Sequence, residues 1–350
     1  MGLLLVTTLR EPDKKLSAAV LERYKEEIID SKKSEKPENV SKPQNEKKAE
    51  PAKNNESSKK SDSSKKYDTP KPSETKKPEE TKKPDTPKPA PQKPAEKTAE
   101  QPAQKPAEPV QVPVAQSKYN FPKAKNNAQL IFVFDDGGQN LNHLTPFLKL
   151  PFPITVAVLP QLAYSKDTAA KTRASGNEVI LHQPMQAVNA SVNPGPGAIK
   201  PEMSESEIKS ILFQNITEIG PIAGMNNHEG SAITADAEKM ATVMQFCSQE
   251  GIFFLDSRTN VETQVPYVAR ELGYSYYERN IFLDNEKTNE NALKELKKGL
   301  DLANKNGSVI MIGHIWSADF LPAFLQDVYP ELKAQGYTFS TVSKSRARKN

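Results

Sequence analysis

The chain lacks the cysteines of disulfide-rich proteins and the excess of basic over acidic residues that is typical of nucleic-acid-binding proteins. Its 350 residues include one cysteine, Cys247, which excludes an intramolecular disulfide framework and a multi-cysteine zinc site. The formal charge is only +4, and the lysines of residues 31–118 are interleaved with glutamates rather than gathered in a basic block, so no nucleic-acid partner is indicated. Long apolar runs are also lacking. Residues 2–6 are apolar, but Arg10 and Glu11 follow too soon for a spanning helix or a normal signal-peptide core. A membrane tether would therefore need a further segment upstream.

Aromatic residues are almost absent from residues 31–118, where Tyr67 is the only one. A segment of this kind cannot bury enough apolar surface to offset the entropy lost on folding, so we interpret it as a disordered linker. In residues 1–30, apolar side chains at helical spacing predict a short amphipathic helix, with a marginal helix that lacks a partner as an equal alternative. Residues 119–345 are long enough to form one sizeable core.

Strands and helices alternate from residue 128 onwards. Apolar stretches predict strands at 130–135, 154–159, 178–182, 223–227, 252–256, 281–284, 308–314 and 337–342. Helical patterns fill the gaps, and Ser204 with Glu207 forms a capping box while Gly307 is a natural helix end. The first strand is apolar throughout, which is typical of burial on both faces. This alternation predicts an α/β fold with a mostly parallel sheet, either doubly wound or closed into a barrel.

Carboxylates and imidazoles follow the predicted strands. Their positions are Asp135, Asp136, His182, His228, Asp256, Asp284 and His314. In a parallel barrel these strand ends converge on one rim. Three of the four histidines stand there, and we interpret the fourth, His143, as structural or surface-exposed. Adjacent carboxylates must be separated by environment, balanced by a cation or share a proton, although a solvated turn is the alternative for Asp135 and Asp136 alone.

One carboxylate and two neutral imidazoles with an open position are typical of a catalytic zinc site. Such an ion lowers the pKa of its water towards roughly 7 and polarises a carbonyl. A second carboxylate could accept the proton of this water, and a histidine across the rim could protonate the departing group. The residues therefore predict hydrolysis of an amide or ester. Other first-row metals would also suit this ligand set.

A phosphotransferase of the haloacid dehalogenase type is a competing interpretation of a strand that ends in aspartates. That chemistry needs a second carboxylate two residues after the first. The two positions concerned hold Gly137 and Gly138, so the pattern fails. The three strand-end histidines would also have no role.

Several longer motifs stand at the same strand ends. They are residues 132–136 (FVFDD), 175–182 (SGNEVILH) and 308–314 (SVIMIGH). These motifs resemble those of the polysaccharide deacetylases, which remove acetyl groups from chitin-like and peptidoglycan sugars. The second motif of that family ordinarily holds two ligating histidines four residues apart, whereas Gln186 occupies the second position here. Residues 182–185, 225–234 and 254–259 resemble the divergent branch, in which the fourth strand, here with His228, supplies the missing ligand.

The resemblance implies a distorted (β/α) barrel of about seven parallel strands. It also implies a divalent metal, preferably zinc, bound by Asp136, His182 and His228. Asp135 would then be the catalytic base and His314 the catalytic acid.

The roles of the remaining rim residues stay open. Asp256 and Asp284 either orient a ligand histidine or the base, or cap the turns that follow. A second set either lines the sugar pocket or forms turns, and comprises Asn227, Glu229 and Ser231. Trp316 either stacks on a sugar ring or packs in the core.

Taken together, these features predict that residues 119–345 are the catalytic domain of a metal-dependent polysaccharide deacetylase-like hydrolase. Its partner would be an acetylated glycan, its state a monomer and its location the periplasm or another extracytoplasmic part of the cell envelope. The alternative is a non-catalytic glycan-binding or scaffold module on the same barrel. Both aspartates and His314 favour the enzyme, because a binder needs no adjacent base and acid.

Overall fold

One parallel sheet organises residues 117–350, the part of the chain that the computed structural model describes. Eight strands of this sheet lie in the order β6-β5-β4-β3-β2-β1-β8-β7, and a further strand, β9, pairs with β1. The strands are β1 (Gln129–Gly137), β2 (Thr155–Val158), β3 (Glu178–Met185), β4 (Gly224–Glu229), β5 (Phe253–Asp256), β6 (Tyr277–Glu278), β7 (Ile281–Phe282), β8 (Ser308–His314) and β9 (Thr338–Ser340). The helix predicted within residues 1–30 and nearly all of the predicted linker 31–118 lie outside the described residues.

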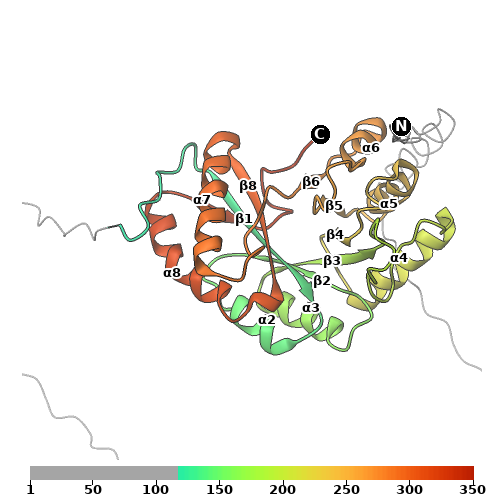
Figure 1. Cartoon of the computed structure of the whole chain (residues 1–350), viewed down its shortest axis with the longest axis horizontal. Coiled ribbons are helices and arrows are strands. Elements are labelled where there is room, and N and C mark those ends of the chain that lie inside the picture. Colours follow the sequence, from blue (N-terminus) through green and yellow to red (C-terminus); the bar gives the residue numbers. More distant parts are fainter. Residues whose placement is uncertain (1–116) are drawn as a thin grey trace, which may run out of the picture. The chain divides into compact units, whose positions relative to one another are not determined.

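Helices surround the curled sheet on its outer side (Figure 1). They are α2 (Leu141–Phe147), α3 (Ser165–Ala174), α4 (Glu205–Ile219), α5 (Ala237–Gln249), α6 (Val265–Leu272), α7 (Asn289–Asn306) and α8 (Leu321–Ala334), with a short 3-10 helix at Ile315–Ser317. The capping box of Ser204 and Glu207 is confirmed at the start of α4, and Gly307 ends α7 in a left-handed conformation as predicted. Among the helices within residues 117–350, none is long and apolar enough to cross a membrane.

The predicted α/β class and the distorted, barrel-like sheet of about seven parallel strands are confirmed. The curled path has eight strands, one of which, β6, is only two residues long and leaves no sequence pattern. In the described chain no ladder joins β6 to β7, so the sheet is an open half-barrel. The turn between these strands spans the opening, since the Arg279 N–H donates to Asp256 O and the Asn280 N–H donates to Ile310 O.

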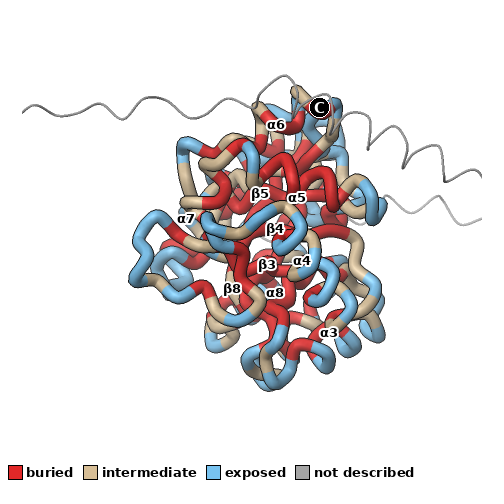
Figure 2. The backbone as a smooth tube through the Cα atoms, turned by 90° about the vertical axis from the view of Figure 1, so that its right-hand side faces the viewer, coloured by how far each residue is buried: buried red, intermediate tan, exposed pale blue. Residues whose placement is uncertain are grey.

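The strands separate two apolar clusters. A large cluster fills the space between the outer face of the sheet and the helices. A smaller cluster fills the interior of the half-barrel and contains Ile131, Val133, Ala157, Ile180, Phe253, Leu255, Tyr277, Ile310, Ile312 and Val342. The central strands are accordingly buried along most of their length (Figure 2). This confirms that β1 is covered on both faces, as its continuous apolar run predicts.

The period-two alternation of the inner face leads directly to the site. On β1 the inward residues Ile131 and Val133 are followed by Asp135. The same step of two leads from Ile180 to His182 on β3 and from Ile312 to His314 on β8. The interior is therefore apolar in its lower layers and polar at the carboxyl end of the strands, which is where barrel enzymes carry their chemistry.

Candidate metal and catalytic site

The end of β1 is irregular, and this irregularity brings two adjacent aspartates to one site. The register between β1 and β2 shifts between Phe134 and Gly137, and Asp136 has a left-handed backbone with φ +62°. For a residue other than glycine such a conformation costs roughly 1–3 kcal/mol. The turn allows the Asp136 carboxylate to reach the same histidine as Asp135, although consecutive strand residues ordinarily point to opposite faces.

Asp136, His182 and His228 form a compact group of potential metal ligands. Oδ1 of Asp136 lies 3.3 Å from Nε2 of His182 and 3.1 Å from Nδ1 of His228. The two ring nitrogens are 3.1 Å apart. A tetrahedral ion with bonds of about 2.0–2.1 Å holds its ligand atoms about 3.3–3.4 Å from one another. The three atoms are thus spaced as one ion requires.

The hydrogen bonds of Asp136 also fit a metal ligand. Its Oδ2 accepts a hydrogen bond of 2.9 Å from the indole N–H of Trp316. Its Oδ1 is buried and has no hydrogen-bond partner, although both imidazole nitrogens are close. Burial opposes ionisation of this carboxyl, but the attraction of His182 and His228 outweighs burial and holds the pKa of Asp136 well below its usual range. An ionised oxygen without a donor is what a bound cation would satisfy.

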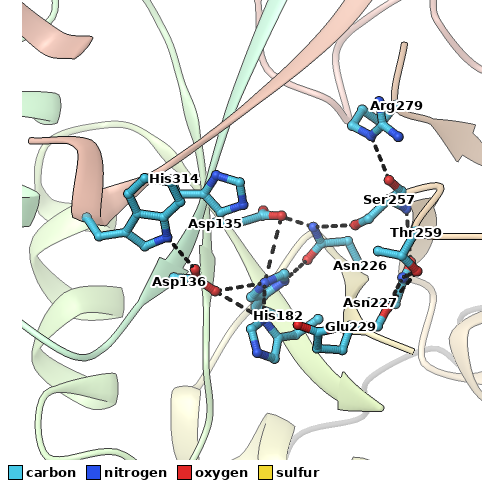
Figure 3. A network of polar contacts seen from close by, with 12 residues as sticks. Asp135, Asp136, His182, Asn226, Asn227, Glu229, Ser257, Thr259, Arg279 and His314 are labelled. Atoms are coloured by element: carbon cyan, nitrogen blue, oxygen red, sulfur yellow. Dashed lines mark hydrogen bonds and ion pairs between the residues drawn. The ribbon is translucent and has the colours of Figure 1, made fainter. Parts of the chain in front are cut away.

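Asn226 of β4 connects the metal ligands to the predicted base (Figure 3). Its Nδ2 donates to Oδ1 of Asp135 at 2.9 Å, so its Oδ1 faces Nδ1 of His182 at 2.8 Å. His182 must then carry a proton on Nδ1, and its Nε2 lies on the side of Asp136 and His228. Burial alone would lower the pKa of His182, but the nearby charge of Asp135 and contact with Asp136 raise it to about 9.

Asp135 and His314 are direct neighbours in the sheet, on β1 and β8. Oδ1 of Asp135 is held by Asn226, while its Oδ2 lies 3.8 Å from Nε2 of His182. Burial raises the pKa of Asp135 above its usual value. Only 2% of this residue is exposed, so its second oxygen faces the ligand group rather than bulk solvent.

His314 is oriented by Asp284. Nδ1 of His314 lies 2.9 Å from Asp284 Oδ1, and Oδ2 of Asp284 accepts from the His314 backbone N–H at 2.8 Å and from Ser317 Oγ at 2.6 Å. Burial alone would lower the pKa of His314, but the hydrogen bond and the charge of Asp284 outweigh it and raise the pKa. The imidazole therefore keeps its proton to higher pH than a free histidine, with Nε2 available on the opposite side of the ring.

The family described as divergent polysaccharide deacetylase matches residues 132–345. The chain belongs to this family. Uncharacterized protein YibQ of Escherichia coli (strain K12) is 34% identical over 189 residues, which cover 53% of this chain and 58% of YibQ. An uncharacterized protein of Haemophilus influenzae is 31% identical over 198 residues, which cover 57% of this chain and 69% of that protein. The matched region thus spans little more than half to two thirds of these relatives.

A solved structure has a fold similar to that of this chain. The crystal structure of uncharacterized protein ATU2773 from Agrobacterium tumefaciens C58 superposes with a TM-score of 0.59 at 19% identity. The superposition covers 63% of this chain and 89% of that protein. At this identity the likeness supports the fold alone.

Several other residues considered in the sequence are not among the potential metal ligands. The Asp256 carboxylate accepts from the Arg258 N–H at 2.8 Å and from Thr263 Oγ1 at 3.0 Å, so it caps a turn, which is the structural alternative of its two interpretations. Gln186 donates weakly to two carbonyl groups of its own loop. His143 is exposed on α2. Trp316 stacks on His314 with ring centroids 4.7 Å apart, and its N–H is engaged by Asp136.

The three residues predicted either to line a sugar pocket or to form turns make loop contacts. Asn227 accepts from the Ser257 N–H and donates to Glu229 O. Glu229 itself is exposed and has φ +52°, and Ser231 Oγ accepts from the Val188 N–H. All three thus shape the loops that follow β4.

Sequence reasoning missed Asn226, although a signal was present. The inward face of β4 begins with Gly224, and a period of two makes Asn226 and then His228 inward. Asn227, which was singled out instead, points its side chain towards the loop after β5.

Proposed function

We propose that this chain is a metal-dependent hydrolase that removes acetyl groups from the sugars of a polysaccharide or peptidoglycan-type glycan. Membership in the divergent polysaccharide deacetylase family and the Asp/His/His group support this proposal. The observation that carries it is the pairing of Asp135 with His314 on neighbouring strands beside that group. A buried carboxylate and a protonated imidazole at one metal site are the parts that acyl transfer to water requires.

Each residue has a distinct task in this reaction. Asp136, His182 and His228 would hold the ion, and when bound it would polarise the acyl carbonyl and lower the pKa of a water molecule. Asp135 takes the proton of the attacking water on Oδ2, since its Oδ1 is engaged by Asn226. His314 donates a proton from Nε2 to the departing sugar oxygen or nitrogen. Asp284 keeps that imidazole oriented and protonated.

We propose zinc as the ion, because two imidazoles and one carboxylate suit it well. From the acetylated glycan substrate we propose that the protein works in the periplasm or another extracytoplasmic part of the envelope, and we also propose that it is a monomer.

The test is release of acetate from acetylated chito-oligosaccharides and peptidoglycan fragments by the full chain, with and without added zinc. We expect zinc-dependent release, and a loss of roughly 10²–10⁴-fold in turnover for Asp135→Asn at saturating zinc, which is what general base catalysis contributes. Full activity of Asp135→Asn would show that the base is assigned wrongly.

A non-catalytic scaffold predicts a different result from the same samples. Such a protein would bind the glycan without releasing acetate, and would do so equally well after Asp135→Asn. Binding is measured by pull-down on insoluble glycan, beside the acetate assay. Binding without zinc-dependent acetate release would support the binding module and contradict the hydrolase.

A further inference from the structure

A pocket of about 430 Å³ adjoins the candidate metal site at His228. Its walls come from three loops at the carboxyl end of the sheet, which follow β1, β2 and β3. The lining is largely apolar, with leucine, alanine and proline side chains that include Leu159, Leu162 and Pro194. No acidic side chain, lysine or arginine belongs to it.

The walls of this pocket are held in place by buried amides. Asn215 of α4 donates to Gln183 Oε1 at 2.8 Å and to Gly197 O at 2.9 Å, and accepts from Gln161 Nε2 at 2.9 Å. Gln183 adds a bond of 2.8 Å to Gly197 O. Asn215 and Gln183 are completely buried. The network ties the loop after β2 to the loop after β3, so the pocket is preformed rather than a gap between mobile loops.

The position of the pocket indicates which part of a substrate would enter it. His314, the proposed acid, is on β8, and the departing sugar atom must lie next to it. The pocket is walled mostly by the loops after β2 and β3, two strands that β1 separates from β8, and in part by the loop after β1 itself. The substituent that points away from the leaving group in an ester or amide is the acyl chain.

The chemistry of the lining agrees with an acyl chain better than with a second sugar. Sugar hydroxyls lose hydrogen bonds to water when they enter an apolar pocket, and few groups here could replace those bonds. An alkyl chain loses none and instead displaces water from apolar walls. The methyl group of acetyl would fill little of a volume that corresponds to on the order of ten waters.

We infer that the pocket beside His228 binds the acyl chain of the substrate, and that the enzyme accepts linear acyl groups longer than acetyl in addition to acetyl itself, with a higher kcat/KM for the longer groups. The inference rests on the proposed hydrolase function. Each methylene buried in the pocket should raise kcat/KM about fourfold until the pocket is full, because the free energy of transferring one methylene from water to an apolar site corresponds to about a fourfold change in an equilibrium constant.

The experiment measures kcat/KM of the zinc-loaded full chain on 4-nitrophenyl acetate, butyrate, hexanoate and octanoate. The leaving group is constant in this series, so differences report the acyl chain. Asp135→Asn is measured on every ester to show that hydrolysis takes place at the proposed site. We expect kcat/KM to increase from acetate to hexanoate by on the order of 10²-fold, which is four methylenes at the stated factor.

Two variants locate the effect. Ala163 is exposed and lines the pocket, so Ala163→Trp should occupy part of it and lower the hexanoate-to-acetate ratio at least tenfold. Ala170, exposed on α3 and not part of the lining, is the matched control, and Ala170→Trp should keep the parent ratio.

The outcomes separate the inference from the function on which it rests. Esterase activity that needs Asp135 but is greatest on acetate, or a chain-length preference that Ala163→Trp leaves unchanged, overturns the acyl pocket and leaves the hydrolase standing. Absence of zinc-dependent hydrolysis on every ester, together with no acetate release from glycans, overturns both.

Discussion

Strand β3 carries one polar residue near the amino end of the half-barrel and another near the carboxyl end, and the two residues differ in their polar partners. At the amino end, Glu178 accepts hydrogen bonds from Thr155 Oγ1 and from the backbone and hydroxyl of Ser343, all of them neutral donors. At the carboxyl end, His182 lies against two carboxylates, one of which has an oxygen without a donor. The Glu178 carboxylate is thus satisfied by hydrogen bonds from neutral groups, whereas Oδ1 of Asp136 at the carboxyl end has no hydrogen-bond donor.

The same contrast appears in the chain segments that cover the two ends. The segment after β9 lies against the amino end, where Val342 enters the interior apolar cluster and donates its N–H to Thr155 Oγ1. At the carboxyl end, loops after β1, β2 and β3 leave a pocket open beside His228. A pocket of about 310 Å³ also lies at the amino end, with Glu178 and Thr341 in its lining, but among the described residues the group of potential metal ligands lies at the carboxyl end, and this distinguishes the two ends.

The largest expected effect comes from removing a metal ligand at the carboxyl end. His182→Ala and His228→Ala should each reduce the metal content of the purified full chain from about one equivalent to near zero, since two remaining ligands cannot replace a three-ligand site. Elemental analysis measures the content. His143→Ala, which changes an exposed histidine on α2, is the control and should keep the parent value. Equal metal content in all three variants would contradict the ligand assignment.

Asp284→Asn tests whether Asp284 keeps His314, the proposed acid, protonated. His314 acts as an acid only while protonated, so activity falls as pH rises through its pKa. Asp284 raises that pKa, and its replacement should move the alkaline limb of the pH–rate profile to lower pH. Turnover at pH 8 should fall by on the order of 10²-fold, part of what a general acid contributes.

The matched control for this change is Asp256→Asn. Asp256 also stands at a strand end, but it caps a turn. This variant should lose stability and keep the alkaline limb where the parent has it. A limb that moves equally in both variants would mean that Asp284 has no special relation to His314.

Asn226→Leu should weaken metal binding without removing a ligand. The variant leaves Nδ1 of His182 and Oδ1 of Asp135 without their partner, so the imidazole is no longer held in the required tautomer. Loss of such supporting bonds typically costs about 10–100-fold in metal affinity. Competition with a chelating dye measures the affinity.

The neighbouring residue supplies the control for Asn226. Asn227→Leu breaks bonds to Ser257 and Glu229 in the loops and should destabilise the fold by a similar amount. Its metal affinity in the folded state should remain that of the parent. If both variants lost metal affinity equally, the loss would reflect a general destabilisation of the fold and not the orientation of His182 by Asn226.

The smallest effect is expected at the amino end. Glu178→Ala removes the acceptor of Thr155 and Ser343 and should lower the free energy of unfolding by about 1–2 kcal/mol in urea titrations. Metal content and turnover should stay unchanged. A drop in metal affinity would show that the two ends are coupled, contrary to the comparison.

The sequence by itself determined the α/β class and the positions of the strand-end residues Asp135, Asp136, His182, His228 and His314. These features depend on local patterns, because an apolar run that stops at a polar residue is visible within a few positions. The same local reasoning found the capping box of α4 and the end of α7.

Only the tertiary structure decided which side chains meet. The curl of the sheet and its register bring Asn226 between His182 and Asp135. They also place Asp284 within hydrogen-bond distance of His314, whereas Asp256 accepts a hydrogen bond within a turn. The strand β6 and the pocket beside His228 were likewise beyond the sequence. A two-residue strand has no pattern of its own, and a pocket formed by three loops depends on contacts between segments far apart in the chain, which no local spacing encodes.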